Sequence, residues 1–346
     1  MKYIQLLSLF VLVFSCGGQK QIIETNPNTI EQVTENIQEE QKTWIQTESK
    51  NAVGVASHVD IKAVTSSLEY LASDDLEGRN TGSAGIEKAA VYIEDVFKNN
   101  NIKPYFETYR DSFNIKKIVG YNVVGYLEGN DPDLKNEFVI LGAHYDHIGT
   151  AKAVNGDVIA NGANDDASGT VAVLEWVKYF AKTKSNKRSV LFTLYAAEEM
   201  GLKGSGHLAE RFKKENLDLY TMINFEMIGV PRAEDNIMAY ITGYHVSNMA
   251  TKLNAYSGSE IVGFLPQAKS YNLFQRSDNY PFYEQFGIPA HAISTFDFTN
   301  FEYYHHVDDE ADKMDFNHMT RFINQMIPAL EGMINTSTKE IKMNNE

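Results

Sequence analysis

Apolar runs alternate with amphipathic stretches along the chain from residue 59 onward. Residues 138–143 and 188–196 are predominantly apolar over their whole length, which is typical of strands covered on both faces. Residues 59–72, 86–97 and 317–333 have apolar positions at helical spacing, which predicts amphipathic helices. By the same criteria, further strands are predicted at 105–115, 119–127, 220–227, 237–242 and 287–294, and further helices at 167–181 and 246–256. Strands that alternate with helices predict an α/β fold, a three-layer sandwich in which a mixed, mostly parallel sheet is flanked by helices.

The start of the chain has a different character. Lys2 precedes an apolar run at 4–14, and small residues follow around Cys16, the only cysteine among the 346 residues. This is the pattern of a secretory signal rather than of a transmembrane helix. Residues 13–16 also resemble a bacterial lipoprotein box, which implies cleavage before Cys16, lipidation of its thiol and export to the bacterial cell envelope, anchored on the periplasmic side or at the outer membrane. A plain signal peptide or an uncleaved anchor is the alternative.

Composition divides the rest of the chain into a spacer and one domain. Residues 16–50 are rich in Gln, Glu, Asn and Thr and poor in aromatic residues, so they cannot bury enough surface to offset the entropy of ordering. We therefore expect a signal peptide at 1–15, a flexible spacer at 16–50 and one folded domain at 51–340. The net charge of −15 argues against a nucleic-acid partner, because phosphate binding needs a basic face.

Polar side chains gather where the predicted strands end, the edge at which open α/β sheets bind ligands. His144 and Asp146 follow the first buried strand, and residues two apart on an extended backbone share a face, so the carboxylate is able to orient the imidazole. Further clusters lie at 165–166, 198–199, 226 and 304–309. Adjacent residues on an extended chain point in opposite directions, so Glu198 and Glu199 are expected to have different roles. Taken alone, the clusters at 144–146 and 165–166 each have an ordinary explanation, since Asp166 or Asn164 can cap a helix and His144 can be a buried core histidine.

Five motifs, taken in order, resemble those of the co-catalytic di-zinc aminopeptidases. They are Gly-Ala-His-Tyr-Asp at 142–146, Gly-Ala-Asn-Asp-Asp-Ala-Ser-Gly at 162–169, Ala-Glu-Glu-Met-Gly-Leu-Lys-Gly-Ser at 197–205, Ser-Asp at 277–278 with Gly-Ile-Pro at 287–289, and Tyr-His at 304–305. The family includes bacterial leucyl and Vibrio-type aminopeptidases, with glutamate carboxypeptidase II and glutaminyl cyclases as relatives. The resemblance covers roughly residues 60–335. It implies a zinc-exopeptidase fold, which is phosphorylase/hydrolase-like, and two zinc ions per chain.

The resemblance also implies a role for each matched residue. The implied zinc ligands are Asp165, which bridges both ions, His144 and Glu226 at one ion, and Glu199 and His305 at the other. Glu198 matches the general base, and Asp146 matches the carboxylate that orients His144. Asp309 is expected to orient His305 in the same way. The bond between residues 165 and 166 matches a cis peptide bond of the family.

The chain departs from the family pattern at Glu226, where aspartate is usual. Glutamate is one methylene longer and still able to bind zinc, so the departure bears on the geometry and affinity of that ion. His147 and His306 have no ligand counterparts in the family, and we interpret them as structural or substrate-facing. The segments 149–164 and 264–278 are predicted to be long loops near the site, which makes them candidates for substrate contact.

The resemblance implies an aminopeptidase that acts on peptides with a free N-terminus, with a zinc-activated water as nucleophile and Glu198 as its base. A carboxypeptidase would need basic groups to bind a terminal carboxylate, and Arg232 and Arg276 are the nearby candidates. A single-zinc glutaminyl cyclase usually presents tryptophans to its substrate, whereas Trp44 falls in the spacer and Trp176 in a predicted helix. A receptor-like module without catalysis would lack ligands, and every ligand position is filled here.

Overall fold

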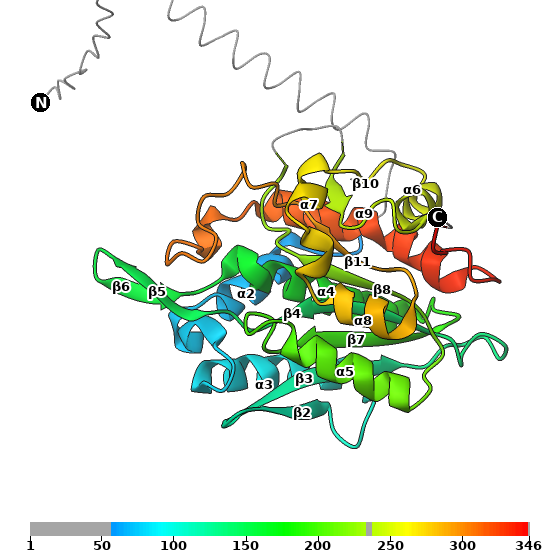
Figure 1. The fold of residues 1–346 in the computed structure, drawn as a ribbon, viewed down its shortest axis with the longest axis horizontal. Coiled ribbons are helices and arrows are strands. Elements are labelled where there is room, and N and C mark those ends of the chain that lie inside the picture. The colour runs from blue at the N-terminus through cyan, green and yellow to red at the C-terminus, as the bar shows by residue number, and fades with distance from the viewer. Residues whose placement is uncertain (1–56, 233–236, 345–346) are drawn as a thin grey trace, which may run out of the picture. The chain divides into compact units, whose positions relative to one another are not determined.

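The computed structural model describes residues 57–232 and 237–344, which are coloured in Figure 1. The predicted signal peptide, Cys16 and the spacer at 16–50 lie outside the described residues. Contacts between residues separate the chain into 1–55 and 56–346, and the fold below belongs to the second unit. None of the helices in the described ranges has both the length and the hydrophobicity that a bilayer crossing requires.

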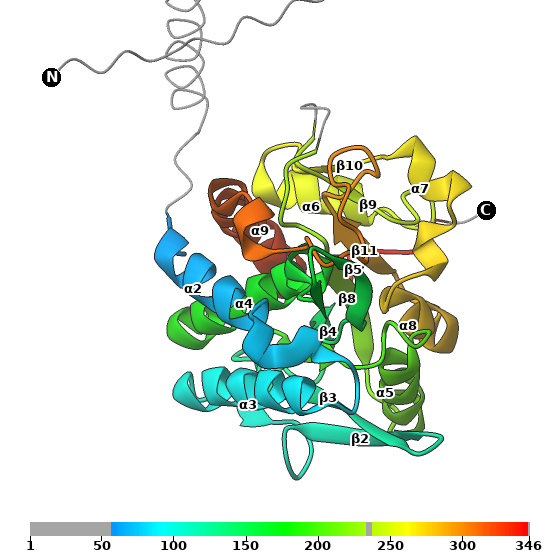
Figure 2. The ribbon, with the colours of Figure 1, turned by 90° about the vertical axis from the view of Figure 1, so that its left-hand side faces the viewer.

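A nine-stranded mixed sheet forms the middle layer (Figures 1 and 2). Its strands run in the order β1 (Lys103–Pro104), β3 (Ile118–Leu127), β7 (Ser189–Tyr195), β4 (Phe138–His144), β8 (Leu219–Glu226), β11 (Ala290–Ser294), β9 (Ala239–Ile241) and β10 (Val262–Gly263), and β2 (Arg110–Ile115) pairs with β3. The central strands β7, β4, β8 and β11 are parallel to one another, while β3 and β9 join them antiparallel. The central strands β4 and β7 are buried nearly throughout, which explains their continuous apolar runs.

Helices cover both faces of the sheet, as the two views show. One face packs against α5 (Lys203–Lys214) and α8 (Asn279–Phe286), whose Phe212 and Phe282 belong to one buried apolar cluster with strand residues such as Ile140. The opposite face packs against α2 (Ile61–Leu71), α3 (Ala84–Asn99), α4 (Gly169–Thr183), α6 (Met249–Ser257) and α9 (Phe316–Asn335). Trp176 of α4 is fully buried, lies 4.3 Å from Phe225 between ring centroids and donates its N–H to a main-chain carbonyl of α9. The predicted three-layer α/β sandwich is confirmed.

Four segments differ from the predictions. One is 264–278, predicted as a loop, which contains α7 (Pro266–Ser270) and η3 (Leu273–Gln275). Residues 149–164, predicted as a loop, contain a hairpin of β5 (Gly149–Val154) and β6 (Asp157–Ala160). Most of its residues are at least partly exposed, so they carry no apolar alternation that would reveal a strand. Helix α8 is absent from the predictions because Pro281 and its aromatic residues disfavour a helix, although proline in a first turn leaves no hydrogen bond unmade. Only the second half of the predicted strand 105–115 forms β2. Short helical segments complete the fold: η1 (Asp74–Arg79), η2 (Ala163–Ser168), α7 (Pro266–Ser270), η3 (Leu273–Gln275) and η4 (Ala311–Lys313).

The register of the parallel strands brings their carboxyl ends level with one another. His144 at the end of β4 pairs with Tyr195 at the end of β7, and Glu226 at the end of β8 pairs with Ser294 at the end of β11. Residues that follow these strands therefore emerge at one edge of the sheet, where α/β proteins bind their ligands.

Candidate metal centre

Three neighbouring strands deliver acidic and imidazole side chains to this edge. His144 is the last residue of β4, Glu226 is the last residue of β8, and Glu198 and Glu199 follow the end of β7. Because β7, β4 and β8 are adjacent in the sheet, residues far apart in the sequence become neighbours. The loop before α9 adds His305 from the other side of the cluster, in contact with Glu199.

The backbone beside these side chains is left-handed at several non-glycine residues. The φ angle is 56° at Ala197, before Glu198, 48° at Met227, after Glu226, and 55° at His305 itself. Each such residue costs about 1–2 kcal/mol relative to the right-handed conformation. Left-handed residues persist where surrounding contacts dictate the backbone, and they gather at functional sites.

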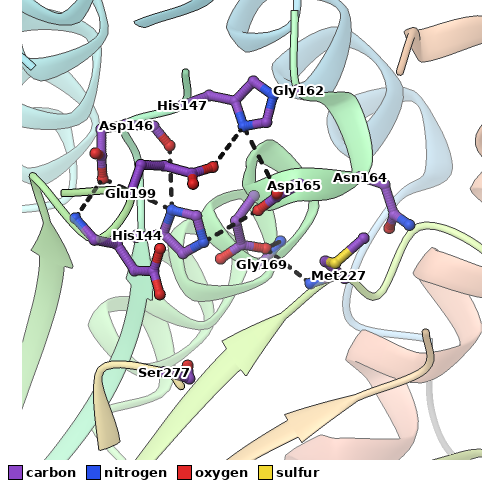
Figure 3. A network of polar contacts seen from close by, with 12 residues as sticks. His144, Asp146, His147, Gly162, Asn164, Asp165, Gly169, Glu199, Met227 and Ser277 are labelled. Atoms are coloured by element: carbon purple, nitrogen blue, oxygen red, sulfur yellow. Dashed lines mark hydrogen bonds and ion pairs between the residues drawn. The ribbon is translucent and has the colours of Figure 1, made fainter. Parts of the chain in front are cut away.

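Asp165 lies at the centre of the cluster, between the imidazoles (Figure 3). Its Oδ1 is 3.3 Å from Nε2 of His144, while its Oδ2 is 3.2 Å from Nε2 of His305 and 3.7 Å from Nδ1 of His147. Glu199 lies across from Oδ2, with Oε1 3.0 Å from Nδ1 of His147 and Oε2 3.0 Å from Nε2 of His305. The two oxygens of Asp165 therefore face different imidazoles, as expected of a carboxylate shared between two ligand groups.

The backbone at Asp165 is held by Asp309. The bond from Asp165 to Asp166 is cis, as the resemblance implies. The carboxylate of Asp309 accepts hydrogen bonds from the main-chain N–H groups of Asn164 at 2.8 Å and of Asp165 at 3.1 Å. The expectation that Asp309 orients His305 is not met, since both of its oxygens bind this backbone. One carboxylate oxygen of Asp166 accepts N–H groups from the start of α4 and from the residue after β8, so its role is structural.

Asp146 connects His144 with the loop after β7. Nδ1 of His144 lies 3.1 Å from the main-chain carbonyl oxygen of Asp146 and 3.7 Å from its carboxylate. Donation from Nδ1–H to that carbonyl leaves Nε2 of His144 available as a ligand. The carboxylate of Asp146 accepts the N–H of Glu198 at 3.1 Å and the hydroxyl of Thr81 at 3.2 Å. Asp146 thus orients His144 through its carbonyl, and its carboxylate positions Glu198.

Several buried carboxylates lie close together in this cluster, and burial raises the pKa values of three of them. Burial, partly offset by His144, raises the pKa of Glu226 to about 7 and that of Asp278 to about 7. Burial and neighbouring carboxylates likewise raise the pKa of Glu198. Burial alone would lower the pKa of His305, but contact with two carboxylates outweighs it and raises the pKa to about 10. An excess of carboxylates in a region of low dielectric favours a bound cation.

Several ligand atoms in the cluster lack a hydrogen-bond partner among the described residues. They are Nδ1 and Nε2 of His147, Oδ2 of Asp165, Oε1 of Glu199 and Nε2 of His305. Native proteins pair roughly 90% or more of their buried polar atoms, so a concentration of unpaired ligand atoms fits a site that binds a metal ion. The ligand atoms of His147, Asp165 and Glu199 lie within 4.8 Å of one another. Nitrogen and carboxylate donors of this kind fit zinc.

A second group of donors lies on the other side of Asp165. It consists of His144, which contacts Oδ1 of Asp165, and Glu226, whose pKa is shifted by the charges of both residues. The structure therefore brings together His144, Asp165, Glu199 and His305, with Glu198 and Glu226 facing the same cluster.

Two residues of the site are absent from the predicted set. His147, interpreted from the sequence as structural or substrate-facing, contacts Asp165 and Glu199 directly. The sequence feature that points to His147 is its position directly after Asp146, in the same loop. Arg79, which falls in a polar loop of the sequence, is a fully buried residue of η1 that donates to main-chain carbonyls around the site. His306 lies outside the cluster, and its Nδ1 accepts a nearby N–H at 3.1 Å.

Residues 122–330, more than half of the chain, match the profile of peptidase family M28. Curated proteins with similar sequences include a probable zinc metalloprotease of Pyrenophora tritici-repentis, 35% identical over 140 residues that cover 38% of this chain and 31% of the relative. A probable leucine aminopeptidase of Trichophyton verrucosum is 29% identical over 211 residues, which cover 59% of this chain and 53% of the relative. The matched part thus spans about a third to a half of these relatives.

Solved structures share the fold at low sequence identity. A zinc aminopeptidase from Bacillus subtilis has a TM-score of 0.62 and 14% identity, with 82% of this chain and 97% of that chain covered. A glutaminyl cyclase from Fimbriiglobus ruber has a TM-score of 0.61 and 20% identity, with 80% and 94% covered. Since enzymes with these two names share one fold, the fold by itself does not choose between the activities.

Proposed function

The chain belongs to peptidase family M28, and from that membership together with the site geometry we propose that it is a zinc-dependent aminopeptidase. In this proposal the enzyme hydrolyses the N-terminal peptide bond and holds two ions that share Asp165. The observation that carries the proposal is the position of Asp165, with one oxygen toward His144 and the other toward His147 and His305. Glu199 and Glu226 supply the remaining carboxylate donors.

Zinc bound at these residues would polarise the scissile carbonyl and lower the pKa of the attacking water. Glu198 is the residue suited to accept the proton of that water and to pass it to the leaving nitrogen. Its main-chain N–H is held by Asp146, which places its side chain beside the cluster. Its raised pKa, caused by burial and by nearby carboxylates, makes it a better proton acceptor than an exposed glutamate.

The charge of the site supports recognition of an N-terminal amine rather than of a C-terminal carboxylate. Glu198, Glu226 and Asp278 are acidic groups that influence one another within the cluster, in addition to the two carboxylates that contact His305. A free amine is able to donate hydrogen bonds to carboxylates beside the zinc site, whereas a substrate carboxylate finds no basic side chain among these groups. A carboxylate would need a basic partner in the same place.

Exposed aromatic rings beside His305 support a preference for apolar side chains. The ring of Tyr304 stacks on His305 with centroids 4.0 Å apart and lies 5.8 Å from Phe296, which is 4.6 Å from Phe298. Phe298 in turn lies 4.9 Å from Tyr271. Tyr304, Phe298 and Tyr271 are 49%, 42% and 47% exposed, an uncommon gathering of aromatic surface. We expect leucyl and phenylalanyl substrates to be cleaved faster than aspartyl ones.

Arg232 favours carboxypeptidase activity as the second candidate. Arg232 is 8% exposed, and its Nε and Nη1 have no hydrogen-bond partner among the described residues. The guanidinium lies 5.7 Å from the ring centroid of Tyr240, whose strand partner Ser294 is itself paired with Glu226. A buried guanidinium near the site would be able to bind a terminal carboxylate through two N–H groups.

One panel of substrates separates these activities. Aminoacyl-nitroanilides, the same compounds with an acetylated amine, N-acetylated dipeptides and an N-terminal glutaminyl peptide are assayed with and without chelator. The proposal predicts cleavage of free-amine substrates only, loss of activity on chelation and recovery with zinc. Full activity in metal-free protein, confirmed by elemental analysis, would refute the zinc mechanism. Cleavage of the N-acetylated dipeptides that is lost in Arg232→Gln would establish the carboxypeptidase instead.

We further propose that the enzyme is exported and anchored in the cell envelope through a lipid on Cys16, with residues 17–50 as a tether. The sole cysteine of the chain directly follows an apolar run and Ser15, which supports this assignment. Mature protein is expected to partition into detergent, and Cys16→Ala is expected to release it or to block processing. A fully soluble mature wild type with its N-terminus elsewhere would contradict the proposal.

A further inference from the structure

His147 is a fully buried imidazole that lies beside the carboxylates of Asp165 and Glu199. Its side chain is 0% exposed, and neither ring nitrogen has a hydrogen-bond partner among the described residues. Leaving a buried polar group unpaired costs about 1–3 kcal/mol. Its Nδ1 nevertheless lies 3.0 Å from Oε1 of Glu199 and 3.7 Å from Oδ2 of Asp165, and both of these oxygens are also unpaired. The ligand atoms of the three residues lie within 4.8 Å of one another, close enough to share one metal ion.

The fold holds the His147 ring in this position. The main-chain N–H of His147 donates to the carbonyl of Arg79 at 3.3 Å, which fixes the backbone. The ring lies against Gly162, where a Cβ atom would be 2.5 Å from the imidazole and 2.3 Å from the carbonyl oxygen of Asp165. Gly162 has a φ angle of 59°, so it is a position that strongly favours glycine. The rings of His147 and His305 meet edge to face, with centroids 5.6 Å apart.

The distances between these side chains match those of ligands around one zinc ion. Zinc binds nitrogen and oxygen at about 2.0–2.2 Å, so tetrahedral ligands are about 3.3–3.6 Å apart. Asp165 and Glu199 lie between 3.0 and 3.7 Å from the nearest nitrogens of His147 and His305. This group, Asp165 included, therefore offers four protein ligands. The other group, His144 and Glu226 with the shared Asp165, offers three.

We propose that His147 is a fourth protein ligand of the ion held by Asp165, Glu199 and His305. This inference rests on the proposed zinc-dependent function and extends it, because it makes the two ion sites unequal. Four protein ligands close a zinc site, as in structural zinc centres, whereas three leave a position open for water or substrate. The site with His147 is the tight one, and the site with His144 and Glu226 is the weaker and more accessible one.

Graded removal of zinc tests the inequality without an activity assay. Zinc-loaded full-length protein is dialysed against increasing concentrations of a chelator, and ions per chain are measured by elemental analysis. The wild type is expected to lose its two ions in separate steps. Cobalt added back one equivalent at a time is expected to fill the tight site first, which its visible absorption spectrum reports.

Two substitutions with side chains of the same length, His147→Asn and His147→Asp, show whether His147 acts as a zinc ligand or only through packing. The oxygen of asparagine or aspartate can occupy the place of Nδ1, but only the carboxylate is a good zinc ligand. His147→Asn is expected to weaken the tight site at least about tenfold, a loss of the size seen when metal-site partners are removed. His147→Asp is expected to retain separate loss of the two ions. His306→Ala, at the neighbouring histidine outside the cluster, is expected to behave as the wild type.

The outcomes distinguish failure of the inference from failure of the proposed function. Wild-type retention of both ions in His147→Asn would overturn the inference and leave the zinc function standing. Equal losses in His147→Asn and His147→Asp would overturn it too, by showing that the imidazole acts through packing. Wild-type protein that binds no zinc would refute the proposed function itself.

Discussion

Replacing Arg79 tests whether one buried guanidinium holds the site loops together. Arg79 is 1% exposed and lies at the end of η1 with a φ angle of 48°. Its Nε donates to the carbonyl of Tyr145 at 2.9 Å, and Nη2 donates to that of Gly162 at 2.8 Å. Nη1 donates to the carbonyls of Asn161, at 2.6 Å, and of Leu71. The guanidinium thus joins α2, the loop after β4 and the loop that begins η2.

Arg79→Lys keeps the positive charge but loses the fork of N–H groups. A lysine ammonium cannot span carbonyls that lie on three separate segments, and we expect it to retain one of the four. A hydrogen bond to a charged group contributes about 1.5–3 kcal/mol, so losing three lowers the free energy of unfolding by about 4.5–9 kcal/mol. Domains are stable by only about 5–15 kcal/mol, so this loss would remove a large part of the total.

Urea denaturation of metal-free protein measures the effect, with Arg321→Lys on the exposed face of α9 as the control. Surface changes of that kind normally stay within about 0.5 kcal/mol. We expect a large fall in the urea midpoint for Arg79→Lys and weaker zinc retention, because His147 and Asp165 lie on the segments that Arg79 joins. A free energy of unfolding within about 1 kcal/mol of the wild-type value, at unchanged slope, would contradict this expectation.

Two further predictions concern proton transfer and pH. Glu198→Gln is expected to keep about two zinc ions per chain while turnover falls by ~10²–10⁴-fold, because basicity is lost and shape is kept. Glu199→Gln is expected to lose an ion that excess zinc partly restores, and the reverse pattern in elemental analysis would contradict both assignments. Burial lowers the pKa of His291 from 6.5 to about 4, so the unfolded chain binds the extra proton and stability falls as pH drops from about 6.5 to about 4. This fall amounts to about 3 kcal/mol, and urea unfolding of His291→Gln should show a correspondingly smaller pH dependence; an unchanged dependence would exclude His291 as its source.

The hydrophobic pattern of the sequence predicts the central strands but does not predict helix α8. Residues 138–143 predict β4 because burial on both faces selects apolar side chains along the whole strand. Helix α8 has no comparable pattern, since its aromatic residues are divided between the core, where Phe282 is buried, and partly exposed positions. Its helical state is decided by packing against α5 and β11.

Most of the chemical groups that meet at the site were predictable from the amino-acid sequence. His144, Glu198 and Glu226 each follow or end a buried strand, and parallel strands bring their carboxyl ends to one edge whatever their order. The resemblance assigned them to a metal-dependent peptidase, and the match to family M28 agrees with it.

The neighbours that hold those groups in place depend on the packing of the whole chain. Asp309 binds the N–H groups of residues about 145 positions earlier, and Arg79 binds carbonyls up to 83 positions away. The contact of His147 with Glu199 likewise joins two loops that follow different strands. No local period carries such information, because a hydrogen bond or a shared ion depends on distance in space, and the strand order that sets this distance arises from the packing of the whole sheet.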